Sequence, residues 1–340
     1  MMPGGSVVWD NHVCLPLRLD DESFLPQLAR HRAAGANIVS INAGFGDVGF
    51  DRVVATLAVF RRWFAAHGDE FLLVRSPEDV ETACASNRLG IVFDVEGGDC
   101  LGEDPSRVEA LANLGVRWLS LAYNRNNRLG GGCQDDDTGL TPLGAAMVEA
   151  LEHAGVVVCC SHTGARTARE IFERATRPVI FSHSNPSACW SHPRNIDDSA
   201  IRACAATGGV VGINGIGIFL GRASATVHGL VRHVEHVAAL VGPAHVAIAL
   251  DYIYDRAELD AYVLAHPELF PPAEGYGPGI TMLGPESLLA IGDLLLARGW
   301  SVGDVAGVLG GNWRRIASRC WRAEPRGVAA IGSSMTQHSR

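Results

Sequence analysis

The chain has 340 residues, 47% of them hydrophobic, and its 28 Lys and Arg against 37 Asp and Glu give a formal net charge of −9. The basic residues are scattered rather than gathered into a run, so the sequence excludes a surface for nucleic acid. No apolar run reaches the ~18 residues that a membrane span requires, and the start of the chain lacks a basic region followed by an apolar stretch. We therefore expect a soluble protein with no nucleic-acid partner and no membrane partner.

Nine cysteines are spread along the chain, including the adjacent pair Cys159 and Cys160. Their spacing lacks the regular framework that small secreted domains use for disulfide bonds. This cysteine usage favours a reducing environment, and we expect the protein in the cytoplasm.

Eight short apolar runs rich in Val and Ile predict eight β-strands, and segments of helical period follow them. The runs are 6–14, 37–42, 89–96, 117–123, 155–162, 178–183, 209–214 and 245–251. Clear helical segments between them are 50–68, 141–155 and 226–242. Repeated βα units of this number predict a (β/α)8 TIM barrel, although a doubly wound open sheet would show the same alternation.

The chain after the eighth run contains a Pro- and Gly-rich loop at 271–279 and two more helical segments, 285–299 and 301–320. We expect these extra C-terminal helices to pack outside the barrel. Residues 1–321 are then one barrel domain. Residues 322–340 are polar and poor in large apolar side chains, which predicts a flexible tail or a segment used in subunit contacts.

Polar side chains able to bind a metal or a substrate occur at the ends of several predicted strands. They are His12, Cys14, Glu96, Tyr123, His162, His183 and Asp251. Barrel active sites lie at the carboxyl ends of the strands, and alternate residues of a strand share a face, so that Asp10, His12 and Cys14 can point the same way. Imidazole, thiolate and carboxylate groups that converge in this way suit a zinc-like ion.

Each of these residues also has a structural interpretation. Glu96 and Asp251 could cap helices, and Cys14 could be a small buried hydrophobe. The histidines in helical stretches, such as His31 and His233, are assigned to structure rather than to a site. The acidic run at 135–137 is interpreted as a solvated loop, because the spacing of an EF-hand is absent. The coincidence of polar groups across several strands favours a shared site for the remainder.

Several stretches resemble, in order and spacing, the renal (membrane) dipeptidase family, a branch of the metal-dependent amidohydrolase-like barrels. They are DNHVCLPL at 10–17, VEGG at 95–98, the stretch at 123–144, SHTG at 161–164, SHSNPSACWSHPRN at 182–195 and LGGNWRRI at 309–316. The resemblance covers nearly the whole chain. It implies a binuclear zinc site on a barrel and hydrolysis of dipeptides, often with a D-residue at the C-terminal position. It also implies a homodimer.

The resemblance assigns roles by motif. Glu96 would bridge two zinc ions, His162 and His183 would bind one of them, and His12 would bind the other. Asp251 would act as the proton shuttle, accepting a proton from the attacking water and passing it to the leaving amine. Arg194 would pair with the carboxylate of the dipeptide, to which a planar guanidinium is geometrically suited.

Four departures from the family pattern fall around the site. Two of them are Cys159 in place of an aspartate and the stretch 251–254, DYIY, in place of Asp-Phe-Asp-Gly. The other two concern a metal ligand and a substrate contact. Cys14 stands where the family has an aspartate ligand, so that this metal position is retuned or empty and the number of ions is one or two. Tyr123 stands where the family has a histidine that contacts the substrate carbonyl. Two alternatives to a dipeptidase therefore remain: a divergent barrel amidohydrolase with one metal or another amide substrate, and a homologue that binds without catalysis.

Overall fold

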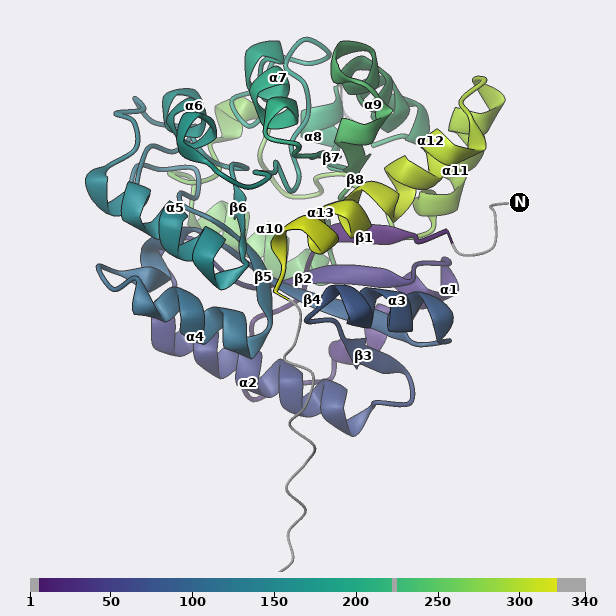
Figure 1. The fold of residues 1–340 in the computed structure, drawn as a ribbon, viewed down its shortest axis with the longest axis horizontal. Coiled ribbons are helices and arrows are strands. Elements are labelled where there is room, and N and C mark those ends of the chain that lie inside the picture. Colours follow the sequence, from purple (N-terminus) through teal and green to yellow (C-terminus); the bar gives the residue numbers. More distant parts are fainter. Residues whose placement is uncertain (1–5, 222–224, 323–340) are drawn as a thin grey trace, which may run out of the picture.

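The structure is a computed structural model that describes residues 6–221 and 225–322, in which strands and helices alternate along the chain (Figure 1). The strands are β1 (Trp9–Cys14), β2 (Ile38–Phe45), β3 (Phe71–Leu73), β4 (Leu89–Glu96), β5 (Val116–Ser120), β6 (Val157–Cys159), β7 (Val211–Ile213), β8 (Val246–Ile248) and β9 (Tyr252–Ile253). All of their pairings are parallel.

The strands follow one another around a central ring. One sheet has the order β6-β5-β4-β2-β1-β9, and β7 and β8 form a second pair. Single-residue parallel bridges, Cys159 with Ile180 and Phe181 with Val211, connect β6 to β7. The prediction of an α/β barrel is confirmed as a barrel-like arrangement, although regular ladders do not run around the whole ring.

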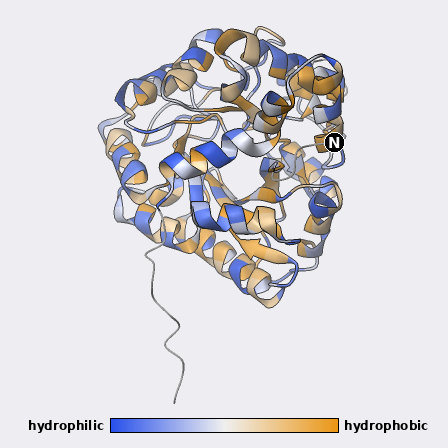
Figure 2. Ribbon diagram, turned by 45° about the vertical axis from the view of Figure 1, so that its right-hand side comes forward, coloured by the Kyte–Doolittle hydropathy of each residue, from blue (hydrophilic) through white to orange (hydrophobic). Residues whose placement is uncertain are grey.

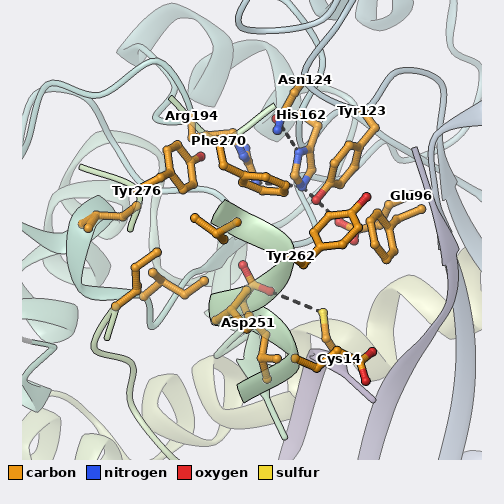
Figure 3. Close-up of a pocket in the computed structure, with 18 of the residues that line it drawn as sticks. Cys14, Glu96, Tyr123, Asn124, His162, Arg194, Asp251, Tyr262, Phe270 and Tyr276 are labelled. Carbon is orange, nitrogen blue, oxygen red and sulfur yellow. Dashed lines mark hydrogen bonds and ion pairs between the residues drawn. The ribbon is translucent and has the colours of Figure 1, made fainter. Parts of the chain in front are cut away.

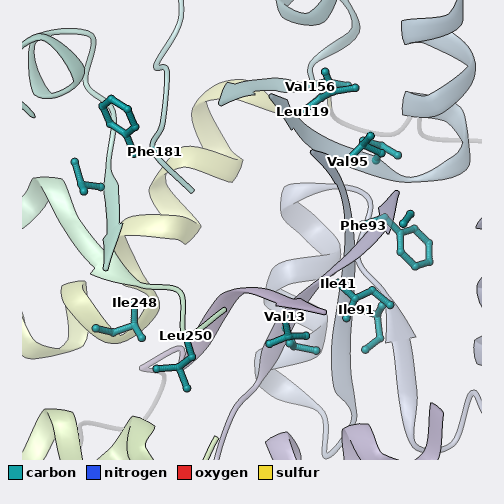
Figure 4. Packing of buried hydrophobic residues seen from close by; sticks show 14 of the residues in the cluster. Val13, Ile41, Ile91, Phe93, Val95, Leu119, Val156, Phe181, Ile248 and Leu250 are labelled. Atoms are coloured by element: carbon teal, nitrogen blue, oxygen red, sulfur yellow. The ribbon is translucent and has the colours of Figure 1, made fainter. Parts of the chain in front are cut away.

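Alternation along β4 separates the packing core from the site. Ile91, Phe93 and Val95 belong to the main hydrophobic cluster, which continues through neighbouring strands as Figure 4 shows. Asp94 and Glu96 occupy the alternate positions and therefore point to the opposite face of the strand. A strand buried on both faces thus carries an apolar side toward the helices and a polar side toward the ring interior.

Helices surround the strands, and Figure 2 shows hydrophobic and hydrophilic residues alternating along them. They are α1 (Ala29–Ala33), α2 (Phe50–Ala66), α3 (Pro77–Ala85), α4 (Ser106–Leu114), α5 (Pro142–Ala154), α6 (Ala165–Arg174), α7 (Asp198–Ala206), α8 (Gly217–Leu220), α9 (Val227–Val241), α10 (Arg256–Ala265), α11 (Ser287–Ala297), α12 (Val302–Ala306) and α13 (Asn312–Cys320). Short 3-10 turns and one π-helical turn, Gly307–Gly311, complete the described elements.

Capping residues explain where several helices begin and end. The Thr141 hydroxyl accepts the backbone N–H of Gly144 directly before Pro142, the first residue of α5. The same helix ends at Gly155, whose φ of 74° lies in the left-handed region. Thr141 and Gly155 thus fix where α5 begins and ends, and the sequence pattern predicted this helix.

The C-terminal helix α13 closes the end of the barrel opposite the site. Trp313 donates its indole N–H to the carbonyl oxygen of Ile248 at 2.9 Å and clusters with Val7 and Trp9 from the start of the chain. The expectation that both extra helices pack outside the barrel therefore needs correction for the second segment, which covers the strand ends. The helix α11 does pack outside, against α9.

Two further differences from the sequence prediction have local causes. The strand β3 was missed, because three residues are too short for a period to show. The predicted strand at 178–183 contributes only the isolated bridges of Ile180 and Phe181. The predicted tail lies outside the described residues apart from Arg322.

Among the described helices, none has the length and apolar character that crossing a bilayer demands.

Candidate metal centre

The polar residues predicted at the strand ends meet in one cavity of about 950 Å³, counting its part open to solvent (Figure 3). Cys14, Glu96, Tyr123, His162, Arg194 and Asp251 line it. His12 and His183 lie directly beneath, buried at 0% and 1% exposure. The structure therefore brings together all eight residues that the sequence singled out.

Two histidines converge on one carboxylate oxygen. The Nε2 atoms of His162 and His183 each lie 3.1 Å from Oε1 of Glu96. The two Nε2 atoms are 3.0 Å apart. All three side chains are buried, so that no bulk water separates these groups.

A second group forms around His12, whose ring stacks on that of His183 with centroids 4.2 Å apart. Its Nε2 atom lies 3.4 Å from Oε2 of Glu96 and 3.5 Å from Oδ1 of Asp251. The Sγ atom of Cys14 lies 3.6 Å from the same Nε2 atom and 3.8 Å from Oδ1 of Asp251. Glu96 thus lies between the two groups.

Outer contacts orient the three imidazoles in the same way. Nδ1 of His162 lies 2.7 Å from the amide oxygen of Asn124, and Nδ1 of His12 lies 3.3 Å from Oδ2 of Asp94. Both partners only accept, so each Nδ1 carries a proton and each Nε2 faces the site.

The outer contact of His183 is a hydroxyl. Its Nδ1 lies 2.8 Å from Oγ of Ser182, and Ser182 Oγ is also placed to donate to Ser161 at 3.3 Å. With that donor used, Ser182 can accept from Nδ1 of His183, which gives the same tautomer. Orientation of ligand histidines through their second nitrogen is characteristic of metal sites.

The donor set suits a metal ion. Oε1 of Glu96 is buried and has no hydrogen-bond partner, although two Nε2 lone pairs face it. Lone pairs and a carboxylate that face one another without a donor repel, unless a cation lies between them. Two overlapping groups have ligand spacing: His12, Glu96 and His183, and His12, Cys14 and Asp251.

Burial and charge set the protonation of these groups. Burial lowers the pKa of His162 well below its usual value, with the Arg194 charge acting in the same direction, and burial also lowers that of His183. Burial opposes the charged form of His12, but Glu96 and Asp94 more than offset it and raise its pKa. Burial raises the pKa of the Cys14 thiol to about 12. The free thiol is thus protonated, and only a cation would favour its thiolate.

Arg194 lies beside this cluster and is 4% exposed. Its Nη2 atom donates to Nε2 of His162 at 2.9 Å. Among residues 6–221 and 225–322, no carboxylate lies within ion-pair distance of its guanidinium. A buried cation without an anionic partner is costly, so this guanidinium is suited to pair with an anion from outside the chain.

Asp251 is held by a residue that the sequence analysis did not single out. Nδ2 of Asn214, which directly follows β7, donates to Oδ2 of Asp251 at 2.7 Å. Oδ1 remains directed at His12 and Cys14. The position of Asn214 at the end of a predicted strand was the one available signal.

Backbone strain is concentrated at the same place. The non-glycine residues with positive φ in the described chain are Asn124 at 59°, His162 at 67° and Asp251 at 55°. All three line the cavity. Such conformations persist where the surrounding structure imposes them, and they are enriched at functional sites. Gly97, which follows Glu96, has a φ of 106°, and a Cβ there would lie 3.1 Å from the carbonyl oxygen of Gly46.

Neither Asp251 nor Glu96 caps a helix, which was the structural alternative for these two residues. The cap of α10 is Asp255 rather than Asp251, and Glu96 faces histidines rather than a helix start.

Asp10 does not join the site: its carboxylate contacts Nε2 of His31 at 3.1 Å and accepts the N–H of Leu250. A register shift in β1 after Asp10 interrupts the expected alternation.

The acidic run at 135–137 serves structural contacts. Asp135 pairs with Arg125 at 2.7 Å. Asp137 accepts from the backbone N–H and the hydroxyl of Thr167 in α6. Asp135 and Asp137 are half-buried and bonded within the chain, so only the exposed Asp136 matches the solvated loop that the sequence predicted.

Fold and site together define a barrel-like α/β protein with a histidine and carboxylate cluster at the carboxyl ends of its strands. Residues 24–261 match the family described as membrane dipeptidase (peptidase family M19). The chain therefore belongs to this family, and the resemblance inferred from its motifs is confirmed. Membership implies a metal cofactor, and the clusters described above are its candidate sites.

Individual relatives agree with this assignment. Dipeptidase verJ of Clonostachys rogersoniana is 28% identical over 270 residues, which are 78% of this chain but only 65% of the length of that relative. An amidohydrolase from Pseudomonas aeruginosa has a similar structure, with a TM-score of 0.84 and 24% identity over 94% of this chain and 97% of its own. A Rhodobacter sphaeroides metallopeptidase, bound to a phosphinate mimic of L-Ala-D-Ala, has a TM-score of 0.76 and 18% identity, over 93% of this chain and 99% of its own.

Proposed function

We propose that the chain is a zinc-dependent dipeptidase that hydrolyses the amide bond of small dipeptides. The observation that carries this proposal is the position of Arg194, a buried cation without a carboxylate partner among the described residues, beside a cluster of three histidines and Glu96. A dipeptide supplies both groups that such a cavity lacks: a carboxylate for the guanidinium and an amide carbonyl near the ligand cluster.

The ligand set that we propose holds two zinc ions. His162 and His183 would bind one, His12 and Cys14 the other, and Glu96 would bridge them. A bound zinc ion supplies a Lewis acid that polarises the scissile carbonyl and lowers the pKa of water. The remaining steps are carried by side chains of this chain.

Substrate binding depends on Arg194. Its planar guanidinium can form two parallel hydrogen bonds to the terminal carboxylate, and burial strengthens this pair because water is excluded. Anchoring the carboxylate fixes the distance from the C-terminal residue to the cluster and positions the amide for attack.

Proton transfer is assigned to Asp251. Oδ1 would accept a proton from the attacking water and then donate it to the leaving amine nitrogen, so that no net proton is gained or lost. Asn214 keeps Oδ2 engaged at 2.7 Å, which leaves Oδ1 free for this exchange.

Tyr123 is proposed to contact the substrate carbonyl. Its ring stacks on His162 with centroids 4.2 Å apart, and burial raises the pKa of its hydroxyl well above the usual value. The hydroxyl therefore stays protonated and can donate a hydrogen bond to the oxygen on which charge develops. This role replaces the histidine usual in the family.

A D-residue at the C-terminal position remains part of the proposal. The ligand of the Rhodobacter sphaeroides protein mimics L-Ala-D-Ala, which supports testing both configurations. The second candidate function, a divergent amidohydrolase with one metal or a different amide, is favoured by Cys14, which stands where the family has an aspartate ligand. None of the nine cysteines forms a disulfide bond, which supports the proposed cytoplasmic location. A homodimer stays a prediction from the family.

The test compares L-Ala-L-Ala and L-Ala-D-Ala with the corresponding C-terminal amides, using zinc-loaded protein. We expect hydrolysis of at least one dipeptide and a loss of about 100-fold in kcat/KM for its amide, because a buried charged pair is worth a few kcal/mol. Arg194→Ala should lose the same factor on the dipeptide and little on the amide. Equal rates for a dipeptide and its amide would show that Arg194 does not bind the substrate carboxylate. If neither dipeptide is hydrolysed, the proposed function is contradicted.

A further inference from the structure

Six aromatic side chains form a continuous arc along the wall of the cavity. This aromatic arc consists of Tyr123, Phe45, Tyr262, Phe270, Tyr276 and Phe219, all of which line the cavity. Neighbouring rings in this order have centroids 5.5, 5.5, 5.8, 5.3 and 6.1 Å apart. Figure 3 labels Tyr123, Tyr262, Phe270 and Tyr276 of the arc and shows Asp251 and Cys14 on the other side of the cavity.

The two ends of the arc lie at the two polar parts of the site. Tyr123 stacks on His162 at 4.2 Å, and the guanidinium carbon of Arg194 lies 5.6 Å from the ring centroid of Phe219. Both ends of the arc therefore lie beside His162, because Arg194 itself contacts this histidine at 2.9 Å. A substrate held by Arg194 and the ligand cluster consequently has the wall of rings next to it.

The arc is separate from the barrel core. Phe219, Phe270 and Tyr276 belong to a small cluster of their own, built by α8, α10 and the loop after α10. Their exposed fractions are 5%, 9% and 7%, so most of each ring is packed, yet each borders the cavity. A concave apolar wall that rigid neighbours hold in place is typical of a preformed pocket for an apolar group.

Charged groups in this part of the wall lie at its margin. Asp255 pairs with Arg18 at 2.6 Å, and Glu258 also contacts Arg18. These carboxylates are thereby compensated and do not favour a cationic side chain in the pocket.

We propose that the aromatic arc is the subsite for the side chain of the C-terminal substrate residue, and that this side chain is large and apolar, with a preference for aromatic rings. The inference rests on the proposed function in one respect, the pairing of the substrate carboxylate with Arg194. The residue that carries this carboxylate would then lie beside Phe219, which is 5.6 Å from the guanidinium carbon of Arg194, and Tyr276 and Phe270 follow Phe219 along the arc. The rings pack on one another, and all of them also line the cavity, where they can offer a substrate side chain the offset and edge-to-face contacts that aromatic groups prefer.

The experiment measures kcat/KM for Ala-Phe, Ala-Leu and Ala-Gly, with the C-terminal residue in both configurations. We expect the Ala-Phe value to exceed the Ala-Gly value by about 10- to 100-fold, the factor given by burial of one large apolar side chain. Phe270→Ala should reduce this ratio by about tenfold, and Phe270→Leu should restore part of it. Leu264→Ala is the matched control, since Leu264 lies on α10 and is 64% exposed.

Equal values for Ala-Phe and Ala-Gly in the unaltered protein, or an unchanged ratio in Phe270→Ala, would overturn the subsite. Tyr262→Ala, a change at a half-buried ring, repeats the test if Phe270→Ala does not fold. Calorimetry with free phenylalanine and free glycine separates this proposal from the proposed function. If no dipeptide is cleaved, tighter binding of phenylalanine that is lost in Phe270→Ala still supports the subsite, and equal binding of both amino acids overturns it.

Discussion

Nδ2 of Asn214 donates to Oδ2 of Asp251 at 2.7 Å, which fixes a carboxylate whose backbone lies in the left-handed region with a φ of 55°. The bond occupies one oxygen and leaves Oδ1 directed at His12. Asn214 thus orients the group to which we assign proton transfer, without lining the cavity itself.

The first prediction concerns this pair. Asp251→Asn should lower kcat by about 100- to 10,000-fold, the usual contribution of a general acid–base group. Asparagine tolerates the left-handed conformation, so the variant should fold. Asn214→Ala should lower kcat by about tenfold, because one hydrogen bond is lost, and should shift the pH profile of kcat. An unchanged pH profile in Asn214→Ala would show that Asn214 has only a structural role.

The second prediction concerns the outer contact of His183. Ser182→Ala removes the hydroxyl that accepts from Nδ1 at 2.8 Å and should weaken zinc binding by about 10- to 100-fold. Competition with a chromogenic chelator measures the affinity. Ser318→Ala, on the exposed side of α13, is the control and should leave the affinity unchanged. Equal affinities in both variants would show that Ser182 does not orient the imidazole.

The third prediction separates two roles of Cys14. If Cys14 is a ligand, Cys14→Ala should lower the zinc content by about one ion per chain, whereas Cys14→Asp should retain it because a carboxylate also binds zinc. Cobalt-substituted protein should show a sulfur-to-cobalt absorption band that Cys14→Ala abolishes. Unchanged stoichiometry and an absent band would assign Cys14 to packing.

The fourth prediction concerns acid stability. His233 in α9 is buried, its Nε2 donates to the carbonyl oxygen of Leu220 at 3.0 Å, and its Nδ1 has no partner. Burial lowers its pKa to about 4. The unfolded chain takes up a proton near pH 6.5, so this residue stabilises the fold above that pH. Between pH 7 and pH 5 its contribution should fall by about 2 kcal/mol.

Urea unfolding of the metal-free protein at pH 7 and pH 5 measures this loss. His233→Gln should show a smaller decrease than the unaltered protein. His236→Gln is the control, because His236 pairs with Asp198 at the surface rather than being buried. The same decrease in His233→Gln and in the unaltered protein would contradict the assignment.

The sequence predicted the ring of strands and the residues at their carboxyl ends well, because both depend on local patterns. Glu96, His162 and His183 each end a predicted strand, and their convergence follows from the geometry of parallel sheets. The outer partners were not predicted. Asp94, Asn124 and Ser182 look like ordinary strand or loop residues until the fold brings them to an imidazole nitrogen.

Other features depend on contacts that no local pattern reveals. The bulge in β1 turns Asp10 to His31 and away from the site, although strict alternation would place it beside His12. Trp313 packs against the strand ends and donates its indole N–H to the carbonyl oxygen of Ile248, which lies 65 residues away along the chain. The aromatic arc draws its rings from separate segments and appears only in the folded chain.

Zinc content per chain and dipeptide hydrolysis, both measured before and after chelation, decide whether this chain is a zinc-dependent dipeptidase. We expect two zinc ions, turnover of a dipeptide, loss of turnover when chelator removes the metal, and recovery when zinc returns. Hydrolysis that persists without metal, or fully loaded protein that cleaves no dipeptide of either configuration, would contradict this function.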